Sequence, residues 1–180
     1  DVYKRQVIIS EHKLGPAYSL HLARSRLPEN RSYIVAYCDV WWEPLDFNIR
    51  NLDKYEAAIF VHRGFHPHLV ADNFSAFCSE RLENDGNLLE IREKGSFTQD
   101  WMSEPVSIGV FYVRDCNILF DAIEEMVSGG EKAAGEYYPS VAFNHLVNSD
   151  VNVKLIDVKS YVHIGVPAQY KDMCHWSKII

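Results

Sequence analysis

Asp39 is the residue whose position points most directly to chemistry. The run from 32 to 37 before it is apolar and predicts a strand, so Asp39 falls at the carboxyl end of that strand. Open α/β sheets bind ligands outside the carboxyl ends of their strands. A carboxylate there can hold the divalent cation that phosphoryl or nucleotidyl transfer requires. Asp39 is therefore a candidate metal ligand, and the alternative is an ordinary loop or helix-capping aspartate.

Helix and strand signals alternate along the chain. Apolar runs predict strands at 7–9, 32–37, 57–61, 107–113, 151–158 and 161–164. Apolar residues at helical spacing predict helices after Gly15-Pro16 up to 27, at 117–127, at 136–147 and from 167 to 176. Segments 74–82 and 88–92 flank an Asn84-Asp85-Gly86 turn, which predicts a hairpin. This order predicts one α/β domain without internal repeats.

Composition narrows the class of protein. The 180 residues suffice for one buried core, and 47% hydrophobic with 24% charged residues indicates neither disorder nor a fibrous protein. A net charge of −7, without a run of basic residues, argues against nucleic-acid binding. The apolar runs are too short to span a membrane, and the four separated cysteines suit a reducing compartment. We therefore expect a cytoplasmic protein with no membrane or nucleic-acid partner.

The first six residues look foreign to the protein. Asp1 to Gln6 (DVYKRQ) is the translation of GAT GTG TAT AAG AGA CAG, a transposon-end adapter of sequencing libraries. We interpret residues 1–6 as translated adapter, which predicts that they lie outside the packed core and that the natural protein begins upstream. The alternative is a genuine polar segment leading into a strand.

Six short segments resemble, in the same order, the motifs of the sugar-1-phosphate nucleotidyltransferase family. LGPAYSL at 14–20 resembles LGTAxAL, and YCD at 37–39 resembles a strand-end NGD. The other four are EIREK at 90–94 (V..F.EKP), SIGVFY at 107–112 (NAGIYVF), Gly135-Glu136 at an expected helix start, and YVHIGVPAQY at 161–170 (WxDIGTPEDY). The YCD and RGFHPH segments resemble a bacterial capsule or surface-polysaccharide branch.

The resemblance implies a fold and a reaction. The fold is a three-layer α/β/α, Rossmann-like (glycosyltransferase-A-like) mixed sheet with an inserted β-hairpin. The reaction joins a nucleoside triphosphate and a sugar-1-phosphate into a nucleotide sugar, with release of pyrophosphate and with Mg²⁺, or alternatively Mn²⁺, as cofactor. The motifs leave the sugar, the base and the oligomeric state open.

The resemblance also implies roles for individual residues. Asp39 matches the acid that holds the metal, and Lys94 matches the lysine that contacts the sugar phosphate, so these two are the expected catalytic residues. The expected substrate-binding residues by resemblance are Gly15 near the base, Glu93 at the sugar hydroxyls, Gly109 beneath the sugar, and Glu136 as a second sugar-side acid. Packing and helix-start charge are the alternatives for Gly109 and Glu136.

Two departures from the family pattern affect activity. The family's first strand and GxGxRL loop have no counterpart, so residues 7–180 correspond to a partial domain without the cradle for the triphosphate. The second metal acid, in WxDIG, is His163 here, and imidazole is a softer ligand than Mg²⁺ prefers. We therefore expect the fragment to be nearly inactive by itself. Ser10 stands where the family has a glutamine near the base.

The loop after the expected strand at 57–61 contains His62, His66 and His68. A zinc site is disfavoured because the sequence offers neither a fourth ligand nor a cysteine pair. In the implied fold this loop faces the cleft, so Arg63 and His66 are expected to meet sugar hydroxyls or phosphate. Trp41 and Trp42 are expected to pack at the sheet edge rather than stack on a ligand.

Two other functions remain open. A glycosyltransferase would share the architecture, but it commonly holds its metal with a DxD pair, and Asp39-Val40-Trp41 lacks the second acid. A catalytically idle sugar-nucleotide-binding or regulatory domain would be compatible with His163.

Overall fold

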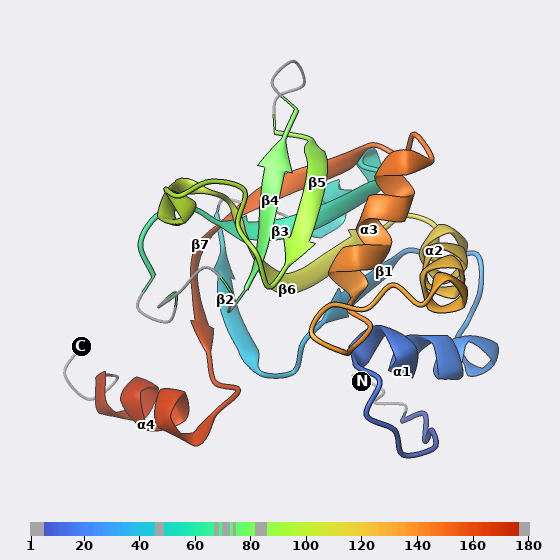
Figure 1. Ribbon diagram of the computed structural model, residues 1–180, viewed down its shortest axis with the longest axis horizontal. Coiled ribbons are helices and arrows are strands. Elements are labelled where there is room, and N and C mark those ends of the chain that lie inside the picture. The colour runs from blue at the N-terminus through green and yellow to red at the C-terminus, as the bar shows by residue number, and fades with distance from the viewer. Residues whose placement is uncertain are drawn as a thin grey trace.

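The computed structural model describes residues 6–45, 49–66, 69, 73, 75–81 and 86–176. In this part of the chain, helices pack on one mixed sheet of seven strands (Figure 1). The strands are β1 (Tyr33–Ala36), β2 (Val40–Pro44), β3 (Ala57–His62), β4 (Ala76–Glu80), β5 (Leu88–Glu93), β6 (Val106–Val113) and β7 (Val153–His163). The helices are α1 (Pro16–Ala23), α2 (Cys116–Gly129), α3 (Pro139–Asn148) and α4 (Pro167–Trp176), with short 3₁₀ segments η1 (Arg24–Arg26), η2 (Ile49–Lys54) and η3 (Trp101–Ser103). The expected α/β fold with a mixed sheet is confirmed.

The sheet has the strand order β2-β7-β3-β6-β4-β5, and β1 also pairs with β6. Only β3 and β7 are parallel; the other described pairs are antiparallel, including the expected β4–β5 hairpin. Residues 110–113 of β6 pair with β1, whereas residues 106–107 pair with β4. Residues 108 and 109 therefore face a break between the end of β1 and the start of β4.

Both faces of the central strands are buried. On one face, Ile59 and Phe111 belong to a core with residues of α2 and α3, and the Phe111 and Phe143 ring centroids are 5.2 Å apart. On the other face, Phe60 lies 4.9 Å from the Trp42 ring and belongs to a second core that includes Leu52 of η2. Burial on both faces explains why β3 and β6 consist of continuous apolar runs.

Local signals set the helix positions. The Asp115 carboxylate accepts a hydrogen bond from Asn117 N (2.9 Å) at the start of α2, and Gly130 ends that helix in the left-handed region (φ 72°). Pro139 occupies the first turn of α3. The side chain of Asn144 accepts from the backbone N of Ile91 and donates to its carbonyl, both at 2.9 Å. This pair of bonds anchors α3 to β5, the strand at one end of the sheet.

The prediction of a strand at 7–9 is wrong. These residues form no strand, and the Ile8 side chain is 82% exposed. A β-branched run becomes a strand only where a neighbour completes its hydrogen bonds, and the described residues place none beside it. Of the suspected adapter, residues 1–5 lie outside the described residues and Gln6 is exposed.

Three further expectations need correction. Trp41 and Trp42 belong to β2, which the sequence did not predict and which pairs with the end of β7. The two strands expected at 151–158 and 161–164 are one continuous strand, β7. The helix expected from 136 begins at Pro139, so Glu136 precedes α3. In the hairpin, Phe74, Leu82 and the turn residues Asn84 and Asp85 lie outside the described residues.

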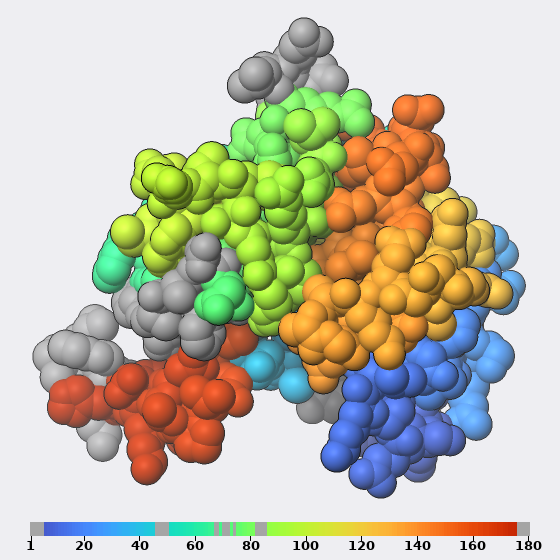
Figure 2. Space-filling model, in the orientation of Figure 1, coloured from blue at the N-terminus to red at the C-terminus, as the bar shows by residue number. Residues whose placement is uncertain are grey.

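Helix α4 stands apart from the other helices. Figure 1 shows α1, α2 and α3 gathered beside the sheet, whereas α4 follows the far end of β7, and Figure 2 shows α4 and α1 as separate masses with a notch between them. The expected helix at 167–176 is confirmed. Among the described residues, no helix combines the length and apolar character needed to cross a membrane.

Candidate active site

A cavity of about 180 Å³ opens at the break between β1 and β4. Asp39, Lys94, Gly109 and His163 all line it, although they come from four separate segments of the chain. The prediction that these four residues share one cleft is confirmed. The other residues that line the cavity are Tyr37, Ser75, Ala76, Glu93, Ser107, Ile108, Phe111 and Tyr138.

Asp39 and His163 are held together by backbone pairing. Asp39 occupies the turn between β1 and β2, and its carbonyl accepts a hydrogen bond from Ile164 N at 2.8 Å. Val40, next to Asp39, pairs with His163 in the sheet. A side chain at Gly165 would collide with Asp39 Oδ2 and would lie 3.5 Å from His163 Nδ1. The glycine thus makes room for the carboxylate beside the imidazole.

Glu93 and Lys94 form the second part of the site, at the end of β5. The Glu93 side chain is only 6% exposed, and its Oε2 accepts a hydrogen bond from Ser140 Oγ at 2.5 Å. Lys94 Nζ lies 3.5 Å from Glu93 Oε1 and 5.5 Å from the centroid of the Tyr138 ring. Lys94 has φ 61°, a left-handed conformation that is strained for a lysine. Its backbone N donates to Ser75 O at 2.9 Å, which holds that conformation.

The surface over Gly109 is occupied, contrary to the expectation of open space beneath a sugar. Gly109 has φ 78°, and an added Cβ would collide with ring carbons of Tyr37. Tyr37 N donates to Gly109 O at 3.0 Å, so backbone and ring both bind Tyr37 to this point of β6. The packing role foreseen for Gly109 is therefore met by Tyr37. Sequence reasoning missed Tyr37, whose only signal is an aromatic residue two positions before Asp39.

Gly15 and Glu136 do not line the cavity. Gly15 precedes α1 with φ 91°, and an added Cβ would lie 2.6 Å from Tyr137 O. Its missing side chain lets the two segments pair, with Tyr137 N donating to Leu14 O at 2.8 Å. The Glu136 carboxylate accepts a hydrogen bond from Tyr138 Oη at 2.7 Å. Glu136 therefore reaches the cavity through Tyr138.

Arg63 and His66 do not line this cavity. Arg63 forms ion pairs with Asp157 (2.7 Å) and with Glu80, across strands β7 and β4. His66 is buried, with Nε2 2.8 Å from Tyr161 O and its ring stacked 3.9 Å from the Tyr161 ring. His68 lies outside the described residues. Of the two tryptophans, Trp42 packs on Phe60 and Trp41 is 54% exposed.

Two tyrosines of the cavity are neutral hydrogen-bonding groups. Burial raises the pKa of Tyr37, and the nearby Glu93 carboxylate raises it further. Burial and the hydrogen bond to Glu136 likewise raise the pKa of Tyr138. Both phenols therefore stay protonated at neutral pH. The proton of Tyr138 is already donated to Glu136, whereas that of Tyr37 has no acceptor among the described residues.

Asp39 and His163 are the residues of the cavity that could hold a metal ion whose remaining ligands are substrate phosphates and water. Within the described residues, no group of three or more His, Cys, Asp or Glu side chains is placed to hold a metal ion. Asp39 offers carboxylate oxygens, and His163 offers an imidazole nitrogen beside them. Mg²⁺ in phosphate-transfer sites is usually bound by one or two carboxylates, with waters and substrate phosphates completing its shell. The Asp39 carboxylate meets that minimum.

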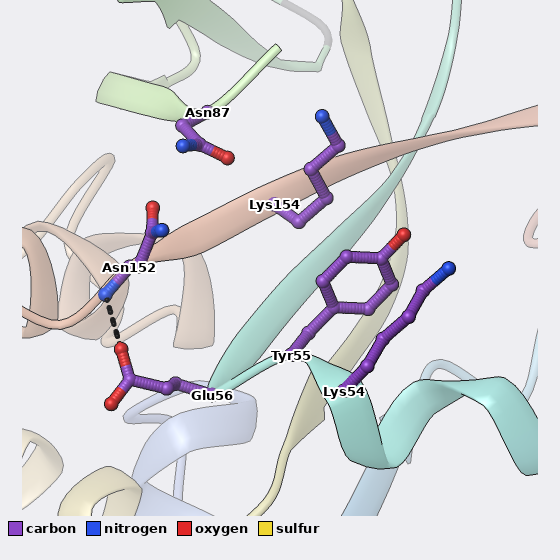
Figure 3. A pocket seen from close by; sticks show the side chains of 6 residues that line it. All are labelled: Lys54, Tyr55, Glu56, Asn87, Asn152 and Lys154. Carbon is purple, nitrogen blue, oxygen red and sulfur yellow. Dashed lines mark hydrogen bonds between the residues drawn. The ribbon is translucent and has the colours of Figure 1, made fainter. Parts of the chain in front are cut away.

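A larger cavity, of about 490 Å³, lies where β3 and β7 begin (Figure 3). Figure 3 shows Lys54, Tyr55 and Lys154 along it, and the Glu56 carboxylate accepts a hydrogen bond from Asn152 N at 3.1 Å. None of the expected site residues lines this cavity. Because α/β sheets bind substrates at the carboxyl ends of their strands, the smaller cavity at the opposite end is the better candidate.

Comparisons with known proteins support the fold. No protein-family model and no curated protein matches the sequence. The chain resembles a nucleoside-diphosphate-sugar pyrophosphorylase from Vibrio cholerae RC9, with TM-score 0.74 and 19% identity over 93% of this chain and 67% of that one. It also resembles a putative glucose-1-phosphate thymidylyltransferase from Bacillus anthracis (TM-score 0.64, 15% identity, 95% of this chain and 64% of that one). A third similar structure is a UDP-glucose pyrophosphorylase from Acinetobacter baumannii (0.64, 19%, 89% and 55%).

These likenesses show that the chain has the Rossmann-like fold of nucleotide-sugar pyrophosphorylases. The chain spans between 55% and 67% of the length of the three structures. About a third or more of each of these proteins thus has no counterpart in this chain.

Proposed function

We propose that the protein is a sugar-1-phosphate nucleotidyltransferase for surface-polysaccharide biosynthesis, and that this chain is its larger, carboxy-terminal part. A phosphate oxygen of the sugar-1-phosphate attacks the α-phosphorus of a nucleoside triphosphate. The bond from that phosphorus to the bridging oxygen breaks, and pyrophosphate leaves. The observation that carries the proposal is the cavity that gathers Asp39, Glu93, Lys94 and Gly109 from three separate segments of the chain in the fold of such enzymes.

Each polar residue of the cavity has a role in this proposal. The Lys94 ammonium pairs with the phosphate of the sugar-1-phosphate, and the Glu93 carboxylate accepts hydrogen bonds from sugar hydroxyls. Asp39, with His163 beside it, would hold Mg²⁺, or alternatively Mn²⁺. The metal ion, when bound, would neutralise charge on the phosphate oxygens. The chain's own contribution is to hold the two phosphates side by side, which removes the entropy cost of bringing them together.

Strand β1 supports the proposal that part of the protein precedes this chain. Its four residues are all apolar, as in strands inside a sheet, yet the described residues pair with it only through β6. Natural edge strands carry charges, prolines or bulges, and β1 has none of these. An apolar cavity of about 260 Å³ adjoins β1, lined by residues that include Leu20 and Phe120. We propose that an upstream strand pairs with β1 and that the phosphate-binding loop follows that strand.

The two alternative functions make different demands on the site. A glycosyltransferase with a DxD pair would need an acid at the position of Trp41, which pairs with Val162 in the sheet. A regulatory domain would bind nucleotide and sugar phosphate in the same cavity without turnover. His163 favours this second alternative, since imidazole is the weaker partner for Mg²⁺.

The decisive measurement is pyrophosphate release from a panel of triphosphates and sugar-1-phosphates. The 180-residue chain should release pyrophosphate at a rate near the uncatalysed one, because it lacks the backbone donors that offset the triphosphate charge. The full-length parent should be active with at least one pair. A parent that binds both ligands but releases no pyrophosphate with any pair would favour the regulatory domain.

Replacing Lys94 by Ala in the parent should chiefly weaken the use of sugar phosphate. We expect the KM for the sugar-1-phosphate to rise about tenfold or more, because a charge-assisted contact to phosphate is lost. The KM for the triphosphate should change less than about threefold, since its phosphates lie nearer Asp39. Lys54→Ala, in the distant cavity of Figure 3, is the matched control and should change neither constant. Equal losses for both substrates would contradict the assigned role of Lys94.

A further inference from the structure

Tyr37 is held rigidly in the wall of the candidate active site. Its backbone N is bonded to Gly109 O, and its ring covers Gly109 so closely that a Cβ there would meet ring carbons Cδ2, Cε2 and Cγ. On another side the ring meets Phe111 edge-on, with centroids 6.1 Å apart and an interplanar angle of 70°. These contacts with Gly109 and Phe111 hold the Tyr37 side chain in one position in the wall of the cavity.

The hydroxyl of Tyr37 lacks the partner that a buried hydroxyl normally has. Tyr37 Oη is buried, and no described residue offers it a hydrogen bond. The carboxylates of Glu93, Asp39 and Glu136 lie close enough to act on it electrostatically, but none of them accepts its proton in a hydrogen bond. Buried polar groups in native proteins are almost always satisfied, so an orphan in a substrate cavity indicates a partner that arrives with the ligand.

We propose that Tyr37 is a specificity-determining substrate residue: its O–H donates to a hydroxyl of the bound sugar phosphate, and its ring, which covers Gly109, limits the size of the sugar that the cavity accepts. The proposal rests on the proposed function. A sugar hydroxyl can donate to one acceptor while its lone pairs accept from another donor. Glu93, which lines the same cavity as Tyr37, is the acceptor, and the O–H of Tyr37 is the donor.

The first test separates the ligand role of the hydroxyl from a structural role. Tyr37→Phe removes one oxygen and keeps the ring, and binding is measured by calorimetry with glucose-1-phosphate, mannose-1-phosphate and inorganic phosphate. We expect at least a tenfold weaker Kd for the sugar phosphate that binds, an unchanged Kd for inorganic phosphate and an undiminished Tm. The Tm should hold because removing an unsatisfied hydroxyl does not cost stability.

Tyr33→Phe is the matched control on the same strand. The Tyr33 hydroxyl donates to Pro28 O at 2.6 Å, so its removal should lower the Tm and leave both affinities unchanged. Tyr37→Phe with an unchanged affinity for the sugar phosphate would overturn the hydroxyl role, and a lowered Tm in addition would identify a structural hydroxyl bonded to water. A wild-type protein that binds inorganic phosphate but none of the sugar phosphates would overturn the proposed function itself.

The second test addresses the ring. Tyr37→Ala opens the space over Gly109, so the preference between glucose-1-phosphate and the bulkier N-acetylglucosamine-1-phosphate should shift at least fivefold toward the bulkier ligand. An unchanged preference in a folded variant would show that the ring does not set the size of the sugar. The ratio of the two affinities is used because it cancels any general loss of binding.

Discussion

In the full-length parent, Asp39→Asn is expected to lower kcat at least ~10²-fold, because preorganised charge at a phosphate-transfer site usually contributes several kcal/mol. The substitution is isosteric, and the backbone contact from Ile164 N to the carbonyl of residue 39 does not depend on the carboxylate. Gly165 leaves the same room for the amide. The Tm should therefore change little, and pyrophosphate release at saturating substrates measures the effect.

The control for this experiment is Asp157→Asn. Asp157 pairs with Arg63 outside the cavity, so its loss should leave kcat within about twofold. If Asp39→Asn retained more than a tenth of the wild-type kcat, Asp39 would not be the metal-binding acid. Loss of Mn²⁺ binding, followed by electron paramagnetic resonance, would test the same assignment without turnover.

Gly15→Ala should destabilise the chain by about 3 kcal/mol, which corresponds to a fall in Tm of roughly 10 °C. Gly15 has φ 91°, and an added Cβ would lie 2.6 Å from the carbonyl oxygen and 2.9 Å from the backbone N of Tyr137. Backbone atoms cannot move away as a flexible side chain can. The contact between the start of α1 and the segment before α3 would therefore have to open.

Gly64→Ala separates this collision from backbone strain. Gly64 has a similar φ of 84°, but no atom lies within 4 Å of the position of an added Cβ. This control should cost only about 1 kcal/mol, the strain of a left-handed alanine. Thermal unfolding followed by circular dichroism measures both variants. Equal losses would mean that the approach of residues 15 and 137 contributes nothing to stability.

The parts of the fold that sequence predicted are those with a strong local cause. Residues 57–61 and 107–113 are apolar at every or nearly every position because both faces are buried, and α4 begins at Pro167 as expected. Strand β2 escaped prediction because Trp-Trp-Glu-Pro shows no alternation and exists through its pairing with β7. Residues 7–9 have strand propensity without a described partner, so the prediction from propensity was wrong.

For the candidate site, too, sequence predicted some features and missed those that depend on contacts between distant segments. The family motifs predicted that Asp39, Lys94, Gly109 and His163 share a cleft, because motif order carries the topology with it. Local sequence could not predict that Tyr37 lies on Gly109, since the contact depends on the register between β1 and β6. Arg63 and His66 were assigned to substrate because the implied fold placed their loop at the cleft. Their partners are acidic and aromatic side chains brought close by the fold.

Asn144 blocks the outer margin of β5 against pairing with a further strand. Its side-chain amide presents one donor and one acceptor to Ile91, so it imitates the peptide group of a further strand beside β5. A further strand could pair with β5 only if the Asn144 side chain, and α3 with it, moved away. Among the described residues, β1 pairs only with β6, and an apolar cavity adjoins it. The sheet is thus closed by a side chain at the β5 margin, and β1 is the margin at which the proposed upstream strand would pair.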